Sequence, residues 1–481
     1  MLLLIRIGYS QPAQPNIIFI LADDLGYGDV SCFNKNGKIH TPSIDRIANA
    51  GVRFTDAHSS SSVCTPTRYS ILTGRYSWRT RLEKGVLGTY DQPLIEKGRT
   101  TMASMLKQQG YRTACIGKWH LGWEWTTTDG GSPIDNADQF NLDFSKPLGG
   151  GPLDIGFDYF FGMDAPNFPP YTYIENRNVI GSPSVYYSKQ PYNDCRPGRG
   201  VEGWNLENIL GDLERKSVNY IDEAAKTKKP FFLYLPITAP HTPIAPSALF
   251  RGRSELNVYA DFVLEVDHFV GAIQDALKKN NINENTILIF TSDNGCSPEA
   301  NFPLLASKGH NPNWEFRGNK ADLFEGGHHV PLLLQWPARI KTSFSVQQTV
   351  CLNDFFASFA SLTGYHLSND EGEDSYNIMP LLLDPTYNKV IREATVHHSL
   401  FGDFAIRKGK WKLLTIPGSG GWSFPNIKKD LEGLPPVQLY DMENDPAEKN
   451  NLFDKHPDVV KELQALLHKY QSEGRSAASL R

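Results

Sequence analysis

A cysteine and an arginine lie four residues apart in the run Cys64-Thr-Pro-Thr-Arg68, which continues as Tyr-Ser-Ile-Leu-Thr-Gly to Arg75. Pro66 is typical of the first turn of a helix, and a spacing of four residues places the thiol and the guanidinium one helical turn apart. An isolated CxPxR pattern is best interpreted as a buried cysteine before a helix. Here the motif extends over a further helical turn, which favours a chemical role for Cys64.

Carboxylate and amide side chains follow two predicted strands. Asp23 and Asp24 come directly after the apolar run 16–22, and Asp293 and Asn294 follow the predicted strand 286–290. Hard oxygen donors of this kind suit calcium or magnesium and not zinc. Either pair alone is interpreted as a turn or a helix cap. Two pairs at strand ends, on either side of the CxPxR motif, instead predict a metal site.

Cationic side chains follow two further predicted strands, and Lys320 precedes the predicted strand 330–335. Lys118 and His120 lie in Gly-Lys-Trp-His-Leu-Gly, His241 lies in Ala-Pro-His-Thr-Pro, and Lys320 lies in Gly-Asn-Lys-Ala-Asp-Leu-Phe-Glu-Gly-Gly. Each could be an ordinary loop residue. Together, fixed cations at strand ends favour an anionic substrate.

Apolar strands alternate with predicted helices along most of the chain. This order predicts an α/β fold with a large, mostly parallel central sheet flanked by helices, in which ligands bind outside the carboxyl ends of the strands. The predicted strands are 16–22, 112–116, 231–235, 286–290 and 330–335, and the predicted helices are 100–109, 206–227 and 256–279.

The pattern changes after about residue 390. Short predicted strands at 404–408, 410–415 and 437–440 precede an amphipathic helix at 457–470. We therefore expect a tail or signal remnant at 1–15, a catalytic domain at 16–390 and a smaller antiparallel α+β subdomain at 391–481.

Composition excludes several classes of function. The 481 residues carry a net charge of −5, which gives no basic face for nucleic acid. No apolar run is long enough to span a membrane. The six cysteines are scattered without a CxxC pair, so neither a disulfide framework nor a structural zinc site is expected. The chain lacks Asn-x-Ser/Thr sequons, which favours a bacterial source.

From about residue 16 to the C-terminal helix, these motifs resemble the type I sulfatases of the alkaline-phosphatase superfamily. The resemblance implies that a maturation enzyme oxidises Cys64 to formylglycine, whose hydrated aldehyde is the nucleophile. One hydroxyl of the diol attacks sulfur, and the other then expels sulfate, so that no stable sulfated enzyme remains. The nearest likeness is to bacterial carbohydrate sulfatases, and it implies export to the periplasm or the medium.

The same resemblance assigns roles to the other motif residues. It implies that calcium, with magnesium as the alternative, is bound by Asp23, Asp24, Cys64, Asp293 and Asn294. Arg68, Lys118 and His120 would hold the diol and the sulfate, and His241 with Lys320 would protonate the leaving oxygen. The family commonly has arginine where this chain has His329. That position is regarded as structural, so we expect the change to alter local packing and leave catalysis intact.

The substrate is less constrained by sequence. We predict a sulfated carbohydrate attacked at a chain end, with 6-O-sulfated galactose or hexosamine as the first choice, and we select His310 and Asn311 as residues that contact the sugar. Two alternatives stay open: a phosphonate monoester or phosphodiester hydrolase, and a non-catalytic sulfoglycan-binding protein. The oligomeric state is not predicted.

Overall fold

The computed structural model describes residues 14–188 and 194–478, so almost all of the predicted tail 1–15 lies outside the described residues. Its largest element is a ten-stranded sheet in the order β13-β2-β12-β11-β1-β10-β4-β5-β6-β7. The strands are β1 (Asn16–Ala22), β2 (Val52–Phe54), β4 (Arg112–Lys118), β5 (Tyr159–Met163), β6 (Ile174–Glu175), β7 (Asn178–Val179), β10 (Phe231–Pro236), β11 (Thr286–Ser292), β12 (Leu332–Gln335) and β13 (Phe344–Val346).

Five strands at the centre of this sheet run parallel. In β1, Ile18 pairs with Leu233 of β10 on one side and Leu288 of β11 on the other, and β4 and β5 continue the parallel order. Strand β12 is antiparallel to β11 and β2. The predicted, mostly parallel α/β sheet is confirmed, and the carboxyl ends of five strands meet at one edge.

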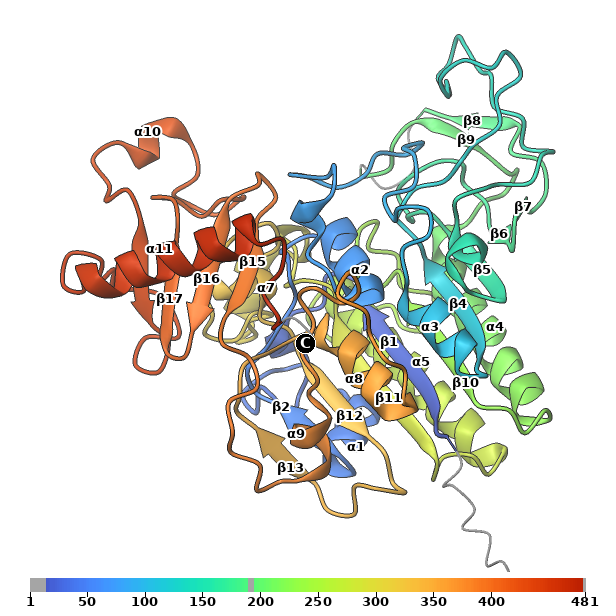
Figure 1. Cartoon of the computed structure of the whole chain (residues 1–481). Coiled ribbons are helices and arrows are strands. Elements are labelled where there is room, and N and C mark those ends of the chain that lie inside the picture. Colours follow the sequence, from blue (N-terminus) through green and yellow to red (C-terminus); the bar gives the residue numbers. More distant parts are fainter. Residues whose placement is uncertain (1–13, 189–193, 479–481) are drawn as a thin grey trace, which may run out of the picture.

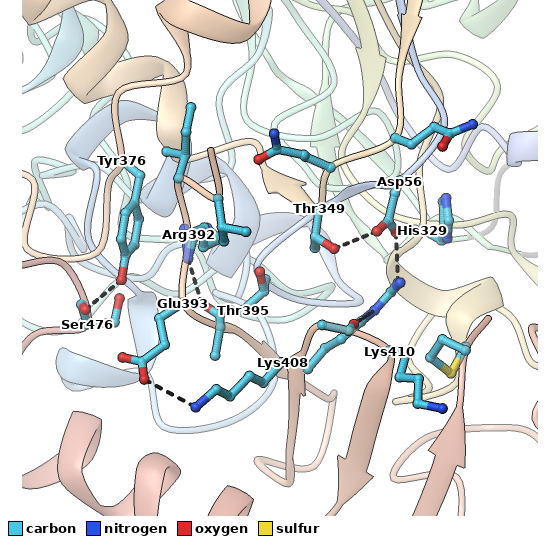
Figure 2. A pocket seen from close by; sticks show the side chains of 18 of the residues that line it. Asp56, His329, Thr349, Tyr376, Arg392, Glu393, Thr395, Lys408, Lys410 and Ser476 are labelled. Atoms are coloured by element: carbon cyan, nitrogen blue, oxygen red, sulfur yellow. Dashed lines mark hydrogen bonds and ion pairs between the residues drawn. The ribbon is translucent and has the colours of Figure 1, made fainter. Parts of the chain in front are cut away.

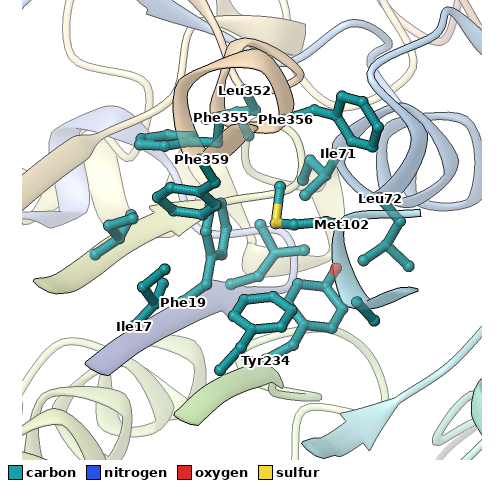
Figure 3. Packing of buried hydrophobic residues seen from close by; sticks show 14 of the residues in the cluster. Ile17, Phe19, Ile71, Leu72, Met102, Tyr234, Leu352, Phe355, Phe356 and Phe359 are labelled. Carbon is teal, nitrogen blue, oxygen red and sulfur yellow. The ribbon is translucent and has the colours of Figure 1, made fainter. Parts of the chain in front are cut away.

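Helices cover both faces of the sheet because β1 sends alternate apolar side chains to opposite sides (Figure 1). Phe19 packs edge-on against Phe355 of α8 with ring centroids 5.3 Å apart (Figure 3). Its neighbours Ile18 and Ile20 belong to the opposite core. One face carries α2 (Cys64–Thr73), α3 (Met102–Gln108) and α8 (Asp354–Thr363), and the other carries α1 (Pro42–Asn49), α4 (Ile209–Ala225) and α5 (Val258–Lys279).

A second sheet follows near the C-terminus. It is antiparallel, in the order β15-β16-β17-β18, and α11 (Pro457–Ser472) packs on it. Its strands are β15 (Thr395–His398), β16 (Phe404–Lys408), β17 (Trp411–Leu414) and β18 (Gln438–Asp441). The sequence predicted three of these strands and missed β15, whose alternation is hidden by two adjacent histidines. The division of the chain at residue 390 stays a prediction.

A groove of about 1270 Å³ separates the β2–β13 side of the main sheet from the second sheet and α11 (Figure 2). Its charged walls are largely paired: Arg407 lies 2.7 Å from Asp56, and Lys408 lies 3.4 Å from Glu393. None of the predicted site residues lines this groove. Among the described residues, no helix is long and apolar enough to cross a membrane.

Candidate active site

The predicted metal and catalytic residues lie at the carboxyl edge of the parallel strands. Asp23 and Asp24 follow β1, Asp293 follows β11, and Lys118 ends β4. Cys64 begins α2, directly against this edge, and its thiol donates to Asp23 Oδ1 over 3.7 Å. The parallel order of the strands is what brings together side chains separated by as many as 270 positions.

Cys64 is buried, with 2 % of its surface exposed. Burial raises the pKa of its thiol to about 12, although the charges of Lys118 and Lys320 oppose this rise. A thiol with such a pKa is almost wholly protonated at neutral pH and is a poor nucleophile. The environment of position 64 therefore disfavours a thiolate nucleophile.

Arg68 lies one helical turn beyond Cys64 and is 1 % exposed. Its Nη2 and Nε donate to Asp293 Oδ2 over 2.7 and 3.1 Å. Its Nη1 donates to the carbonyl oxygen of Lys118 over 3.1 Å, and its Nη2 also lies 3.4 Å from Asp23 Oδ1. These contacts fix the guanidinium in one orientation.

Two lysines hold the aspartates that follow β1. Lys118 Nζ is 2.8 Å from Asp23 Oδ2, and Lys320 Nζ is 2.8 Å from Asp24 Oδ2. Burial alone would raise the pKa of Asp23, but the charge of Lys118, together with that of Arg68, holds it well below its usual range. The site thus keeps ionised carboxylates and fixed cations in a buried volume, where their interactions are strong.

The donor set fits a hard cation. Asn294 donates from Nδ2 to Asp24 Oδ1 over 2.7 Å, while its Oδ1 is buried and has no hydrogen-bond partner among the described residues. Asp293 Oδ1 accepts only a long 3.2 Å bond from the Asp24 amide among the hydrogen bonds of this site. One ligand atom each from Asp23, Asp24, Cys64 and His241 lies within 4.8 Å of the others. Carboxylate and amide oxygens left facing one space are what calcium or magnesium requires. The sequence had given His241 a different role, as the proton donor.

The surroundings of His120 and His241 disfavour the charged imidazolium. Burial, together with Lys118 and Arg68, lowers the pKa of His120 well below its usual value, and burial together with Lys320 lowers that of His241 to about 4. His120 Nε2 is 3.2 Å from the carbonyl oxygen of Leu87, which makes it the donor and leaves the buried Nδ1 without a partner. His241 Nδ1 contacts the carbonyl oxygen of Thr242, so its free Nε2 faces Asp24 at 3.7 Å.

The backbone at the site is strained. Asp24, His120 and Ala321 have φ angles of +64°, +52° and +81°, values that non-glycine residues rarely adopt. Such residues concentrate at functional sites, where the surrounding structure fixes them. The first two belong to the predicted set, and Ala321 directly follows Lys320.

The two residues selected for sugar contact have different surroundings. His310 is 1 % exposed, and both of its ring nitrogens are occupied, by Asp29 and by the Lys38 amide. Asn311 is exposed, and its amide donates to the carbonyl oxygen of Trp314. The geometry gives His310 structural partners within the chain, and direct sugar contact by either residue stays a prediction.

Sequence reasoning missed two buried polar residues near the site. Asp164 follows β5, accepts from Trp123 Nε1 over 3.2 Å, and has its pKa raised to about 7 by burial. Its position directly after a strand is the same signal that selected Asp23. His398 ends β15, and its carbonyl oxygen accepts from the Ser62 amide, two residues before Cys64. No local pattern could have selected His398, because it comes from the second sheet.

His329, which replaces the arginine expected from the family, is also accommodated. Its Nδ1 is 2.7 Å from Glu325 Oε2, and its Nε2 is 3.0 Å from the carbonyl oxygen of Thr55. Both nitrogens therefore have partners.

Comparisons with known proteins show which family the chain resembles. Residues 15–365 match the family model described as Sulfatase. The chain is 34 % identical to an N-acetylgalactosamine-6-O-sulfatase of Bacteroides thetaiotaomicron, over 94 % of this chain and 92 % of that protein. It is 31 % identical to human steryl-sulfatase, over 77 % and 70 % of the two chains. A solved Bacteroides thetaiotaomicron structure, reported with the metabolism of multiple glycosaminoglycans, superposes with a TM-score of 0.82 at 32 % identity and covers 96 % of this chain and 100 % of its own.

Proposed function

Because this chain belongs to the sulfatase family and is a sulfuric ester hydrolase, we propose that it removes 6-O-sulfate from a terminal galactose or N-acetylgalactosamine of a glycan. The observation that carries the chemistry is the cationic cluster of Arg68, Lys118 and Lys320 around Cys64. The choice of sugar is supported by the bacterial relative, which is an N-acetylgalactosamine-6-O-sulfatase and matches nearly the whole chain.

The residues present fit a bound cation and a modified position 64. Asp23, Asp24, Asp293 and Asn294 would hold calcium or magnesium, which would supply positive charge to a sulfate oxygen. Formylglycine at position 64, made by a maturation enzyme, would supply a hydroxyl nucleophile.

The chain's own side chains would do the remaining work. Lys118, Lys320 and Arg68 would stabilise the charge on the sulfuryl oxygens as the ester bond breaks. His120 Nδ1, which has a free lone pair, would accept a proton from the group at position 64. His241 Nε2 would donate a proton to the leaving oxygen once the anionic substrate raises its pKa, since the negative charge favours the imidazolium.

The unit that performs this reaction would be residues 16–390, with 391–481 as a subdomain that adds His398 near the site. We further propose that the protein works in the periplasm or outside a bacterial cell, where sulfated glycans occur. An expressed full chain with its natural leader, assayed in periplasmic and medium fractions, would test that location.

The test of function is sulfate release from a panel of monosulfated sugars. Galactose, N-acetylgalactosamine, glucosamine and fucose, each sulfated at a defined position, would be offered to protein co-expressed with a maturation system and supplied with calcium. We expect release from a 6-O-sulfated galactose or N-acetylgalactosamine and none with Cys64→Ala. Protein shown by peptide mass to carry the aldehyde, yet inactive on every 6-O-sulfate, would refute the proposed substrate. Phosphonate and phosphate diesters in the same panel test the alternative chemistry.

A further inference from the structure

Four buried side chains form a hydrogen-bonded chain beside the Asp23-Asp24 turn and outside the cluster around Cys64. The thiol of Cys296 donates to Tyr259 Oη over 3.1 Å, and the Tyr259 hydroxyl donates to Asp29 Oδ2. His310 Nε2 is 2.9 Å from Asp29 Oδ1. Each of the four is at most 2 % exposed. Nothing in the proposed reaction uses them.

The protons in this chain are fixed by its ends. His310 Nδ1 accepts from the Lys38 amide over 3.2 Å, so Nε2 carries the ring proton and donates to Asp29. The Tyr259 hydroxyl has one proton, which it gives to Asp29 while it accepts from Cys296. The Tyr259 hydroxyl and the His310 ring therefore both donate to the Asp29 carboxylate, which also accepts the Gly26 amide over 2.9 Å. Asp29 is the centre at which the loop, α5 and the segment after β11 are joined.

The turn between Asp24 and Asp29 is held closely on its outer side. The Gly28 amide donates to the carbonyl oxygen of Pro312 over 2.6 Å. A Cβ atom on Gly28 would lie 2.3 Å from the carbonyl oxygen of Asn311, closer than any real contact. On the inner side, Tyr259 Oη lies 3.4 Å from the carbonyl oxygen of Asp24. The turn is thus confined between α5 and the segment that begins at His310.

Asp24 needs this confinement because its φ of +64° is unfavourable for a non-glycine residue. At that angle its carboxylate faces Asn294 and Lys320. A strained conformation of this kind persists only where neighbouring contacts fix it. The amides of Asp24 and Leu25 donate to Asp293 Oδ1 and Ser292 Oγ, and a second group of hydrogen bonds converges on Asp29, five residues further along the same turn.

We propose that His310, Asp29, Tyr259 and Cys296 are positioning residues that hold Asp24 in its metal-binding conformation. The inference rests on the proposed function, because it assumes that Asp24 binds the cation. It gives His310 a role in metal affinity in place of the sugar contact predicted from sequence. Residues that orient metal ligands through hydrogen bonds change metal affinity by about 10- to 100-fold when they are removed.

The test compares calcium affinities of full-length variants. Tyr259→Phe removes only the hydroxyl, and His310→Ala removes the donor to Asp29, whereas His310→Gln retains an amide donor. His397→Gln is the matched control: His397 on β15 is equally buried and donates to the carbonyl oxygen of Ser59, and among the described residues its side chain makes no hydrogen bond to the turn. Calcium would be titrated against the thermal unfolding midpoint of metal-stripped protein and, separately, against turnover of the 6-O-sulfated sugar.

We expect the half-saturating calcium concentration to rise about 10-fold in Tyr259→Phe and His310→Ala, with partial recovery in His310→Gln. At saturating calcium the KM for the sugar stays at the wild-type value. His397→Gln lowers the unfolding midpoint and leaves the half-saturating concentration unchanged. If Tyr259→Phe does not fold, the two His310 variants supply the same comparison.

The opposite results distinguish two failures. If His310→Ala raises KM and leaves the half-saturating calcium within twofold of wild type, His310 contacts the sugar and the positioning role is wrong. If wild-type protein shows no calcium response in either assay, the proposed metal site is wrong and this inference falls with it.

Discussion

Lys412 is a buried cation that links the second sheet to α7 (Glu325–His328). Its Nζ on β17 is 2.9 Å from Glu325 Oε1 and 2.8 Å from Glu448 Oε1, and all three side chains are at most 1 % exposed. Glu325 begins α7 (Glu325–His328), five residues after Lys320. We predict that Lys412→Met, which keeps the length and shape of the side chain, destabilises the fold.

The magnitude follows from what the two carboxylates retain. Removing one member of a buried ion pair costs about 3–5 kcal/mol, because it leaves an uncompensated charge. Glu325 keeps His329 at 2.7 Å and Arg407 at 3.8 Å. Burial already raises the pKa of Glu448 to about 7, so this carboxylate takes up a proton instead of staying charged. Both effects favour the lower end of the range, about 3 kcal/mol at pH 8 and less at pH 6.

Urea denaturation followed by tryptophan fluorescence measures this cost at both pH values. The control is Lys226→Met, which breaks the Lys226–Glu223 pair on α4, where both side chains are 67 % exposed; pairs of this kind contribute well under about 1 kcal/mol. A Lys412→Met variant as stable as the control would refute the reasoning. So would a loss that is larger at pH 6 than at pH 8, because protonation of Glu448 should relieve it.

Three further outcomes are expected. Cys64→Ala abolishes turnover but shifts the urea midpoint little, because the one hydrogen bond of the thiol within the described part of the chain is a weak one to Asp23. A large shift would show a structural role. Chelation of divalent ions lowers the thermal midpoint and the activity, and calcium restores both. Calcium at 100 times its Kd adds about 2.7 kcal/mol to the free energy of unfolding. Equal midpoints with and without chelator would contradict the metal site. The pKa of the Asp164 carboxyl is about 7 in the folded protein and 3.8 in the unfolded chain. The free energy of unfolding therefore falls by up to about 4 kcal/mol as the pH rises from 3.8 to 7, because the folded protein must give up a proton that the unfolded chain has already lost. Urea midpoints of Asp164→Asn should fall less over that interval, and curves that match those of wild type would refute this assignment.

The regular elements were largely predictable because their signals are local. The apolar run ending at Ala22 and the helix before Asn280 have periodicities that only one kind of element satisfies, and both were found within two residues of their observed ends. Strand β15 was missed because Val396 is its single aliphatic side chain, and the two histidines after it give no alternation of apolar and polar residues. Its identity as a strand depends on its partner β16, which lies later in the chain.

For the site, the sequence by itself selected the residues that we propose carry the chemistry, since motif and strand-end position can be read along the chain. It also indicated that Asp23, Lys118 and Asp293 converge, because parallel strands end at one edge. Only the tertiary structure decided the burial of His310 and the strained turn at Asp24. These depend on hydrogen bonds between residues as many as 296 positions apart, and no local pattern encodes which partner a buried polar group will find.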